Sequence, residues 1–156
     1  MGRIDDLWRY DGRRVVVTGC ASGIGEHVAR QLTELGAEVV GLDVQRPALQ
    51  LKQFHQVDLA DAASIDRAAA AIDGRIDALF NIAGVSSGIG EPLRVVTVNF
   101  LGTRRFTEAL VPMMPPGSAS VPTATERSPT RNTNRAAASR TALISVVPLS
   151  IRTTMG

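Results

Sequence analysis

Runs of β-branched residues alternate with amphipathic segments over the first two thirds of the chain. The runs at 14–18 and 38–43 are short and rich in valine, which is typical of buried parallel strands. Apolar residues recur every three or four positions from Ile24 to Leu35, and Gly36 follows as a C-terminal cap, so this segment is predicted to be a helix. Weaker patterns predict a third strand, a second helix, a fourth strand and a long helix, at residues 53–57, 61–72, 77–83 and 95–114.

This alternation predicts the α/β class, with a Rossmann-like, doubly wound parallel sheet of four strands and helices on both faces. The pattern stops at residue 115. From Pro116 onward the chain is mainly serine, threonine, proline, alanine and arginine, and Glu126 is its one acidic residue. The sequence therefore predicts an incomplete domain at 1–115 and an irregular tail at 116–156, in which 142–147 is the one strand-like segment.

Composition fits a soluble globular chain, with 44% hydrophobic and 21% charged residues, but aromatic residues make up only 4%. The core is therefore expected to be aliphatic. The single cysteine, Cys20, excludes an intrachain disulfide, and no basic-then-apolar leader opens the chain, so a cytoplasmic location is expected. Arg104, Arg105 and Glu108 interrupt the long apolar run at 95–114, which argues against a membrane span.

A glycine-rich turn joins the first predicted strand to the first predicted helix. Gly19, Gly23 and Gly25 form the pattern Gly-x-x-x-Gly-x-Gly. Glycines at such a turn let the backbone approach a pyrophosphate, and the unpaired N–H groups of the following helix point at the negative charge. Alone, the pattern is equally typical of an ordinary strand-to-helix loop.

Asp43 adds a second feature, because it ends the second predicted strand about 20 residues past the glycine turn. A carboxylate at this position accepts hydrogen bonds from the adenosine ribose and repels a 2′-phosphate. It therefore favours NAD over NADP, as does the lack of a basic residue at 20–22, although Arg46 offers a partial alternative. The other interpretation of Asp43 is a simple turn aspartate.

Four motifs in order resemble those of the short-chain dehydrogenase/reductase family. They lie at residues 18–25 (Thr-Gly-Cys-Ala-Ser-Gly-Ile-Gly), 57–59 (Val-Asp-Leu), 81–84 (Asn-Ile-Ala-Gly) and 98–102 (Val-Asn-Phe-Leu-Gly). The resemblance covers about residues 12–115 and departs from the family at Ile82, where a second asparagine is usual. The sequence at 96–100 and the short connection between 84 and 95 are most similar to the branch of 3α-hydroxysteroid and coniferyl alcohol dehydrogenases.

The resemblance implies an NAD-dependent oxidoreductase that acts on a small alcohol or carbonyl substrate. It places Asp58 and Leu59 beside the adenine, and it makes Asn99 the helix asparagine that organises a proton-relay water. In full, the cofactor contacts that it implies are Thr18, Gly19, Ser22, Gly23, Ile24, Gly25, Asp43, Asp58, Leu59, Asn81, Ala83 and Gly84.

The family's proton-transfer pair is absent from this sequence. Hydride exchange with an alcohol needs a group that takes the hydroxyl proton, and the family uses a Tyr-x-x-x-Lys pair with a serine. The only tyrosine is Tyr10 and the only lysine is Lys52, so no such pair exists, and no catalytic serine can be assigned. We expect a cofactor-binding fragment with little or no activity.

The tail raises a hypothesis of its own. Its arginine, alanine, proline, serine and threonine mixture is what a GC-rich gene encodes in a wrong frame, which suggests a frameshift near Ala119. The alternative is an authentic divergent tail. Without later strands, the fourth strand would be a bare apolar sheet edge, from which we expect marginal stability and oligomerisation or aggregation.

A second function class stays open beside the oxidoreductase. The chain would then be a noncatalytic binder whose basic tail contacts nucleic acid or another acidic partner, through Arg127, Arg131, Arg135, Arg140 and Arg152. The tail has no aromatic residues between these arginines, which argues against nucleic-acid binding. His27 and His55 lack further ligands at suitable spacing, so no metal site is predicted. Cys20 is interpreted as a small filler of the turn, with a redox role as the alternative.

Overall fold

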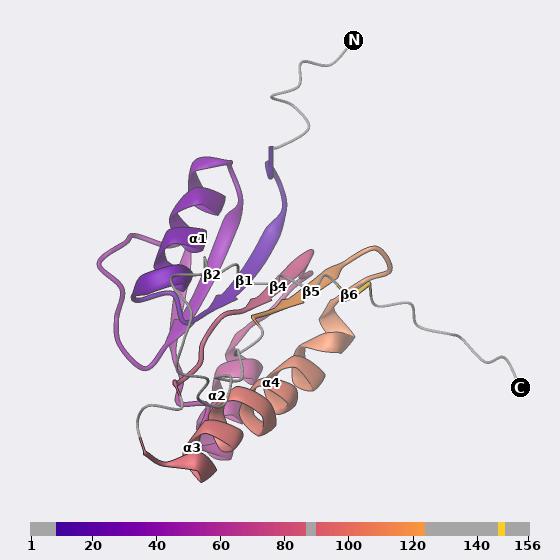
Figure 1. The fold of residues 1–156 in the computed structure, drawn as a ribbon. Coiled ribbons are helices and arrows are strands. Elements are labelled where there is room, and N and C mark those ends of the chain that lie inside the picture. Colours follow the sequence, from indigo (N-terminus) through magenta and orange to yellow (C-terminus); the bar gives the residue numbers. More distant parts are fainter. Residues whose placement is uncertain (1–8, 87–89, 124–146, 149–156) are drawn as a thin grey trace, which may run out of the picture.

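One mainly parallel sheet forms the centre of the computed structural model, which describes residues 9–86, 90–123 and 147–148 (Figure 1). Its strand order is β3-β2-β1-β4-β5-β6. The first five strands are parallel, and β6 pairs antiparallel with β5. The strands are β1 (Arg14–Thr18), β2 (Glu38–Asp43), β3 (Gln53–Gln56), β4 (Ala78–Asn81), β5 (Ala119–Pro122) and β6 (Val147–Pro148).

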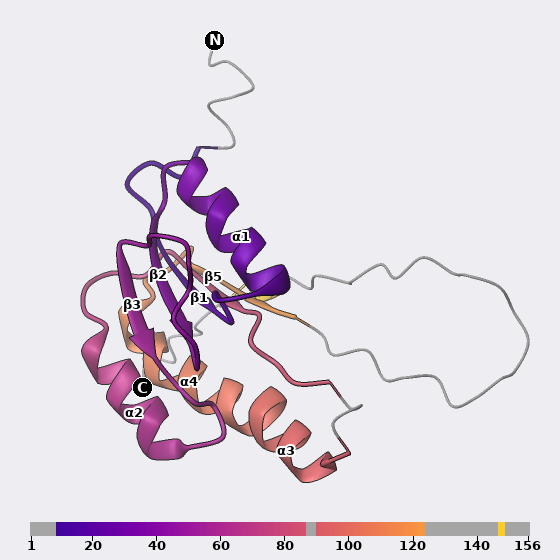
Figure 2. The same ribbon diagram turned by 90° about the vertical axis from the view of Figure 1, so that its left-hand side faces the viewer.

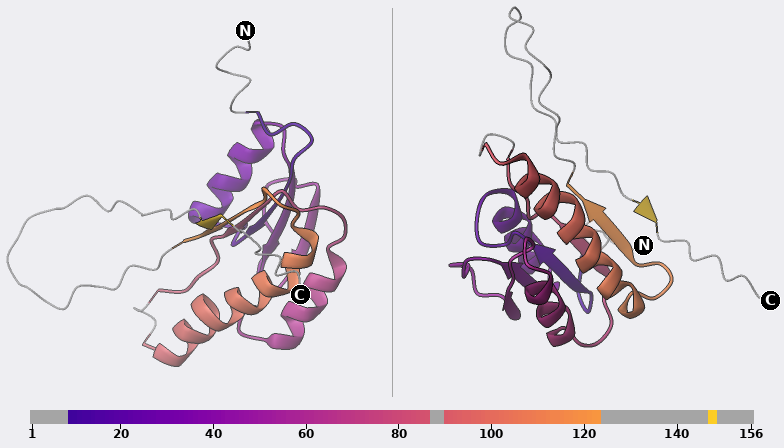
Figure 3. Two further views of the ribbon diagram at one scale, coloured as in Figure 1. Left: turned by 90° about the vertical axis from the view of Figure 1, so that its right-hand side faces the viewer. Right: turned by 90° about the horizontal axis from the view of Figure 1, so that it is seen from below.

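Helices cover both faces of this sheet (Figures 2 and 3). Helix α1 (Gly23–Glu34) lies on one face, and α2 (Ala62–Ala71), α3 (Pro92–Val96) and α4 (Thr103–Leu110) lie on the other. Alternate residues of β1 serve the two faces, because Val15 and Val17 pack in the cluster under α1 while Val16 packs in the cluster under α2 and α4. The predicted Rossmann-like class is confirmed.

The strongest sequence patterns gave accurate element boundaries. Strands β1 and β2 span the predicted residues, and Gly36 ends the α1 segment with a φ of 91°. Asp61 is the N-cap of α2, where its side chain accepts a hydrogen bond from the Ala63 amide. The predicted helix at 95–114 is divided, because a π-helical turn at Thr97–Gly102 separates α3 from α4 and a 3₁₀ turn at Val111–Met113 follows.

The expectation of a bare edge on the fourth strand is wrong. Strand β5 pairs with β4 along its length, and the Ala119 and Thr123 amides donate to the Asp77 and Asn81 carbonyls. Pro122 is compatible with this pairing. N–H groups alternate in direction along a strand, so the position of Pro122 faces away from β4 and its missing N–H costs no hydrogen bond to that strand.

Two predictions for the tail fall beyond the described chain. Of the strand-like segment at 142–147, only Val147 is described, and it begins β6. The five tail arginines, at positions 127, 131, 135, 140 and 152, lie outside the described residues.

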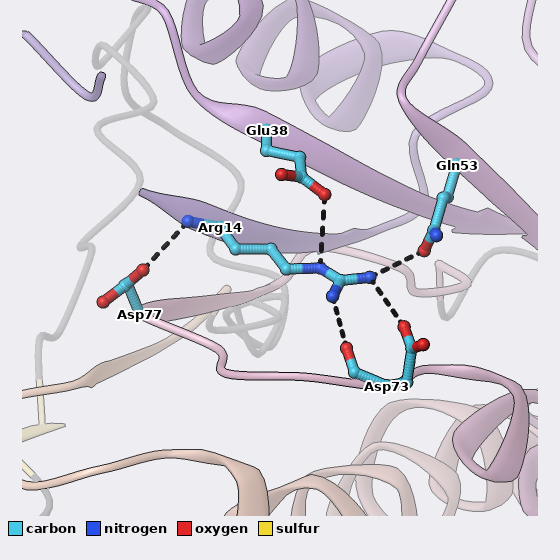
Figure 4. A network of polar contacts seen from close by, with 5 residues as sticks. All are labelled: Arg14, Glu38, Gln53, Asp73 and Asp77. Carbon is cyan, nitrogen blue, oxygen red and sulfur yellow. Dashed lines mark hydrogen bonds and ion pairs between the residues drawn. The ribbon is translucent and has the colours of Figure 1, made fainter. Parts of the chain in front are cut away.

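At the amino-terminal ends of the strands, Arg14 links three strands and the loop before β4 (Figure 4). Its guanidinium donates to the Gln53 side chain at 2.8 Å and to both the carbonyl and the carboxylate of Asp73, and it lies 3.7 Å from the Glu38 carboxylate. Its backbone amide donates to Asp77 at 2.9 Å. This network fixes the edge of the sheet opposite the candidate site.

Candidate functional site

A cavity of about 430 Å³ lies at the carboxyl ends of the parallel strands. Ligands of open α/β sheets bind at this edge, and the volume lies in the range of small-molecule sites. Most of the predicted contact residues line the cavity, namely Gly19, Ser22, Ile24, Gly25, Asp43, Asp58, Leu59, Ala83 and Gly84.

The glycine turn after β1 packs closely against the protein's own backbone. Gly19 has a φ of 75°, and a Cβ there would lie 2.8 Å from the Ala83 backbone. A Cβ on Gly25 would lie 1.9 Å from the Gly19 carbonyl oxygen. Only glycine at these two positions lets the turn and the start of α1 pack so close to the loop after β4.

The first turn of α1 leaves its backbone amides available. Ser22 is the N-cap in extended conformation, and among the described residues its side chain makes no capping hydrogen bond. In contrast, α2 has its Asp61 cap. Unpaired N–H groups at the start of a 12-residue helix attract an anion, and Ser22 and Ile24 line the cavity there.

Asp43 holds its carboxylate at the mouth of the same cavity. One oxygen accepts the Ala21 amide at 2.9 Å, and the other accepts the Gln45 amide at 3.0 Å. These bonds fix the carboxylate between the glycine turn and the loop after β2. A carboxylate in this place can accept hydrogen bonds from ribose hydroxyls.

Asp58 and Leu59 form the opposite wall, after β3. Asp58 accepts the Ala60 amide at 2.8 Å, and its own amide donates to the Ser64 hydroxyl at 3.0 Å. The π-helical turn packs closely against this loop. A Cβ on Gly102 would lie only 2.0 Å from the Leu59 carbonyl oxygen. The close approach of helix and loop thus depends on a glycine.

Three predicted residues support the cavity without lining it. Thr18 is buried, and its hydroxyl accepts the Ile82 and Ala83 amides at 3.0 and 3.1 Å. Asn81 is also buried and donates to the Thr107 hydroxyl at 3.0 Å, which fastens β4 to α4. Gly23, with a φ of 57°, shapes the turn but is likewise not among the lining residues.

Asn99 supports the cavity from the π-helical turn. Its side chain accepts the Val85 amide and donates to the Val85 carbonyl, both at 2.8 Å, and Val85 lines the cavity. π-Helical turns often mark functional sites, because they shift the register of a helix. Here the turn places the Asn99 side chain against the loop that follows β4.

Several lining residues were missed by the sequence analysis. Arg94 and Val98 come from α3 and the π-helical turn, and Thr123 follows β5. The position of Val98 beside Asn99 was a usable signal, since that motif had been recognised. Nothing local marks Arg94 or Thr123, whose places depend on the packing of the long helix and on the unexpected fifth strand.

Tyr10 and Lys52 lie away from the cavity. Tyr10 precedes β1 and Lys52 precedes β3, and parallel strands bring these two positions to the edge opposite the site. Cys20 is fully buried beneath the turn, and its burial, with a smaller contribution from the Asp43 charge, raises the pKa of the thiol to about 12. Among the described residues, no group of three or more His, Cys, Asp or Glu is placed to hold a metal ion.

Comparison with known proteins identifies relatives over the same region. A sequence model of the family described as short chain dehydrogenase matches residues 13–121. The chain is 43% identical over 109 residues to a coniferyl-alcohol dehydrogenase of a Pseudomonas species, which covers 70% of this chain and 42% of that protein. It is 39% identical over 97 residues to a D-threitol dehydrogenase of Mycolicibacterium smegmatis, covering 53% and 37%. The chain thus spans less than half the length of these two relatives.

Solved structures share the fold. An RhlG/NADP active-site complex of Pseudomonas aeruginosa matches with a TM-score of 0.61 and 28% identity, covering 68% of this chain and 48% of that one. A 3-ketoacyl-(acyl-carrier-protein) reductase of Brucella melitensis, complexed with NADH, matches with a TM-score of 0.57 and 28% identity, covering 67% and 50%. None of the helices in the described part of the chain combines the length and apolarity needed to cross a membrane.

Proposed function

Since the chain belongs to the short-chain dehydrogenase family, we propose that its cavity binds NAD at the site of an oxidoreductase for alcohols or carbonyls. The glycine turn would hold the pyrophosphate, Asp43 the adenosine ribose, and Asp58 and Leu59 the adenine. A bound nicotinamide supplies the hydride chemistry. The residues of this chain bind and orient the dinucleotide.

Asp43 carries the choice of NAD over NADP. Its carboxylate lies in the cavity, with each oxygen already fixed by a backbone amide. A 2′-phosphate on the same ribose would lie against this carboxylate, and the two negative charges would repel each other. The known complexes of similar folds include both NADP and NADH, so the proposal depends on this side chain.

Titration of the full chain with NADH and NADPH, by calorimetry, tests this. We expect tighter binding of NADH, by about tenfold, which corresponds to roughly 1.4 kcal/mol. Asp43→Asn removes the charge but keeps an acceptor, so it should bring the two dissociation constants closer together. Preferential NADPH binding by the unaltered chain would refute the assignment, and no binding of either dinucleotide would refute the proposed site.

We also propose that this chain binds its cofactor without turning over an alcohol. The sequence has no Tyr-x-x-x-Lys pair, and Tyr10 and Lys52 precede β1 and β3 at the edge away from the cavity. No other described side chain pairs a phenol with an ammonium group. Similarity to the coniferyl-alcohol dehydrogenase supports an aryl alcohol, with a hydroxysteroid as the alternative, as the substrate of the lineage.

We propose that the chain divides into a nucleotide-binding unit at residues 1–115 and a tail at residues 116–156. We also propose that the tail arises from a shift of reading frame near Ala119. The pairing of β5 with β4 is compatible with this, because strand pairing uses backbone groups that many sequences can supply. Translation of the other two frames of the gene tests the proposal. A serine followed by Tyr-x-x-x-Lys is expected in one of them, and its absence from both would reject a frameshift.

A further inference from the structure

The charges around the cavity are unevenly distributed. Two carboxylates line it, those of Asp43 and Asp58, and Arg94 is the one guanidinium or ammonium group among its described lining residues. A dinucleotide adds a pyrophosphate with two negative charges. Among the described lining residues, Arg94 is therefore the one positively charged side chain that can face this ligand, in addition to the backbone amides of α1.

Arg94 lies on the side of the cavity across the sheet from α1. It belongs to α3, one helical turn before Val98, and residues four apart share one face of a helix. Val98 is buried in the core cluster that contains Val57 and Leu59. The helix face that packs on the Asp58–Leu59 wall thus continues to Arg94, which lines the cavity.

Arg94 is exposed and, among the described residues, its side chain has no hydrogen bond or ion pair. Its neighbours on the same long helix are engaged. Arg104 pairs with Glu108 at 2.7 Å, and Arg105 pairs with both carboxylate oxygens of Asp66 at 2.9 and 2.7 Å. Arg94 can therefore turn to an incoming anion without breaking a contact to the described protein.

We propose that Arg94 binds the pyrophosphate of the dinucleotide, so that the phosphates lie between this guanidinium and the first turn of α1. The inference rests on the proposed function, since it assigns a residue to the same cofactor. A guanidinium presents paired donors that match two phosphate oxygens. The other role open to an arginine here is stacking on the adenine, which needs no phosphate.

Ligands with and without phosphate separate these roles. We suggest calorimetric titration of the full chain, Arg94→Gln and Arg104→Gln with NADH, ADP and adenosine. The Arg104 variant is the matched control, because it removes one positive charge from the same helix outside the cavity. For Arg94→Gln we expect about tenfold weaker binding of NADH and ADP, adenosine binding within about twofold of the unaltered chain, and a reduced dependence on salt.

Other outcomes overturn the inference in distinguishable ways. An equal loss for adenosine would assign Arg94 to the base. An unchanged dissociation constant for ADP, or the same loss in Arg104→Gln, would remove its specific role while leaving the cofactor site intact. If the unaltered chain binds none of the three ligands, the proposed function fails together with this inference. Thermal melts of the unaltered chain and Arg94→Gln should coincide, because Arg94 has no described partner to lose. The melt of Arg104→Gln should differ only slightly, because the pair of Arg104 with Glu108 is exposed to solvent.

Discussion

Cys20 shows how one position in the glycine turn loses its chemical reactivity. The side chain is fully buried, and the thiol pKa of about 12 results first from burial and then from the Asp43 carboxylate. Only the thiolate is nucleophilic, and it is the charged form that burial disfavours. At pH 8 roughly one thiol in ten thousand would be ionised. This favours the filler role of Cys20 over the redox alternative.

We therefore predict that Ellman's reagent labels the folded chain at pH 8 at least about 100-fold more slowly than the chain in denaturing urea. Because the sequence has a single cysteine, the absorbance change reports Cys20 alone. The Cys20→Ala variant gives the background. Complete labelling of the folded chain within the time taken by the unfolded one would contradict the buried, protonated thiol.

The placement of residues was predictable from the sequence where the requirement is local. Gly19 follows from a turn that needs a positive φ, and Asp43 follows from its place at a strand end. Thr18 was predicted to contact the cofactor, and in the structure its hydroxyl accepts hydrogen bonds from the amides of Ile82 and Ala83. That contact joins residues 64 and 65 positions apart, and no local pattern encodes it.

At the scale of elements, the π-helical turn and the loop after β4 form one unit through Asn99. The two hydrogen bonds of its side chain to Val85 fix backbone that lines the cavity. We predict that Asn99→Ala lowers the free energy of unfolding in urea by about 1–3 kcal/mol, because the Val85 amide and carbonyl lose their partner. The Val85 amide should also exchange its hydrogen faster.

The control for Asn99 is Thr97→Ala, two residues earlier. The Thr97 hydroxyl donates to the Leu93 carbonyl within the same helix at an exposed position, so its loss should leave both readouts nearly unchanged. If Asn99→Ala matches this control in unfolding free energy and in exchange at Val85, the clamp has no role in holding the loop. A Gln substitution that also fails to restore protection would show that the geometry of Asn99 matters.

Element predictions succeeded where hydrophobic periodicity was continuous. Strands β1 and β2 have long valine-rich runs, and α1 has both a regular apolar stripe and a glycine stop. The π-helical turn could not be predicted from the sequence. It brings Gly102 against the Leu59 carbonyl, and this contact depends on tertiary packing. Strand β5 was missed because the hydrophobic pattern stops at residue 115 and residues 119–122 contain no continuous apolar run.

At the scale of the whole molecule, the two ends of the parallel strands differ in role. The cavity lies at their carboxyl ends, and the polar network that stabilises the fold lies at their amino-terminal ends. The Arg14 network and Asp77 lie at the edge away from the cavity. Burial raises the pKa of Asp77, but hydrogen bonds from the Arg14 amide and the Arg75 side chain outweigh it. The charges of Arg75 and Arg13 act in the same direction, so the pKa lies below its ordinary 3.8.

A folded-state pKa below the unfolded one means that ionised Asp77 contributes its full stability above about pH 4 and loses it as the pH falls through the folded value. We predict that Asp77→Asn lowers the free energy of unfolding at pH 7 by about 1–3 kcal/mol and flattens its dependence on pH between 4 and 2. Urea unfolding across this pH range measures both effects.

Asp66→Asn is the control, because the Asp66–Arg105 pair is exposed and screened by solvent. The pH profile of this variant should follow that of the unaltered chain. If the two asparagine variants have the same profile, Asp77 and the arginines around it do not govern the acid stability of this fold.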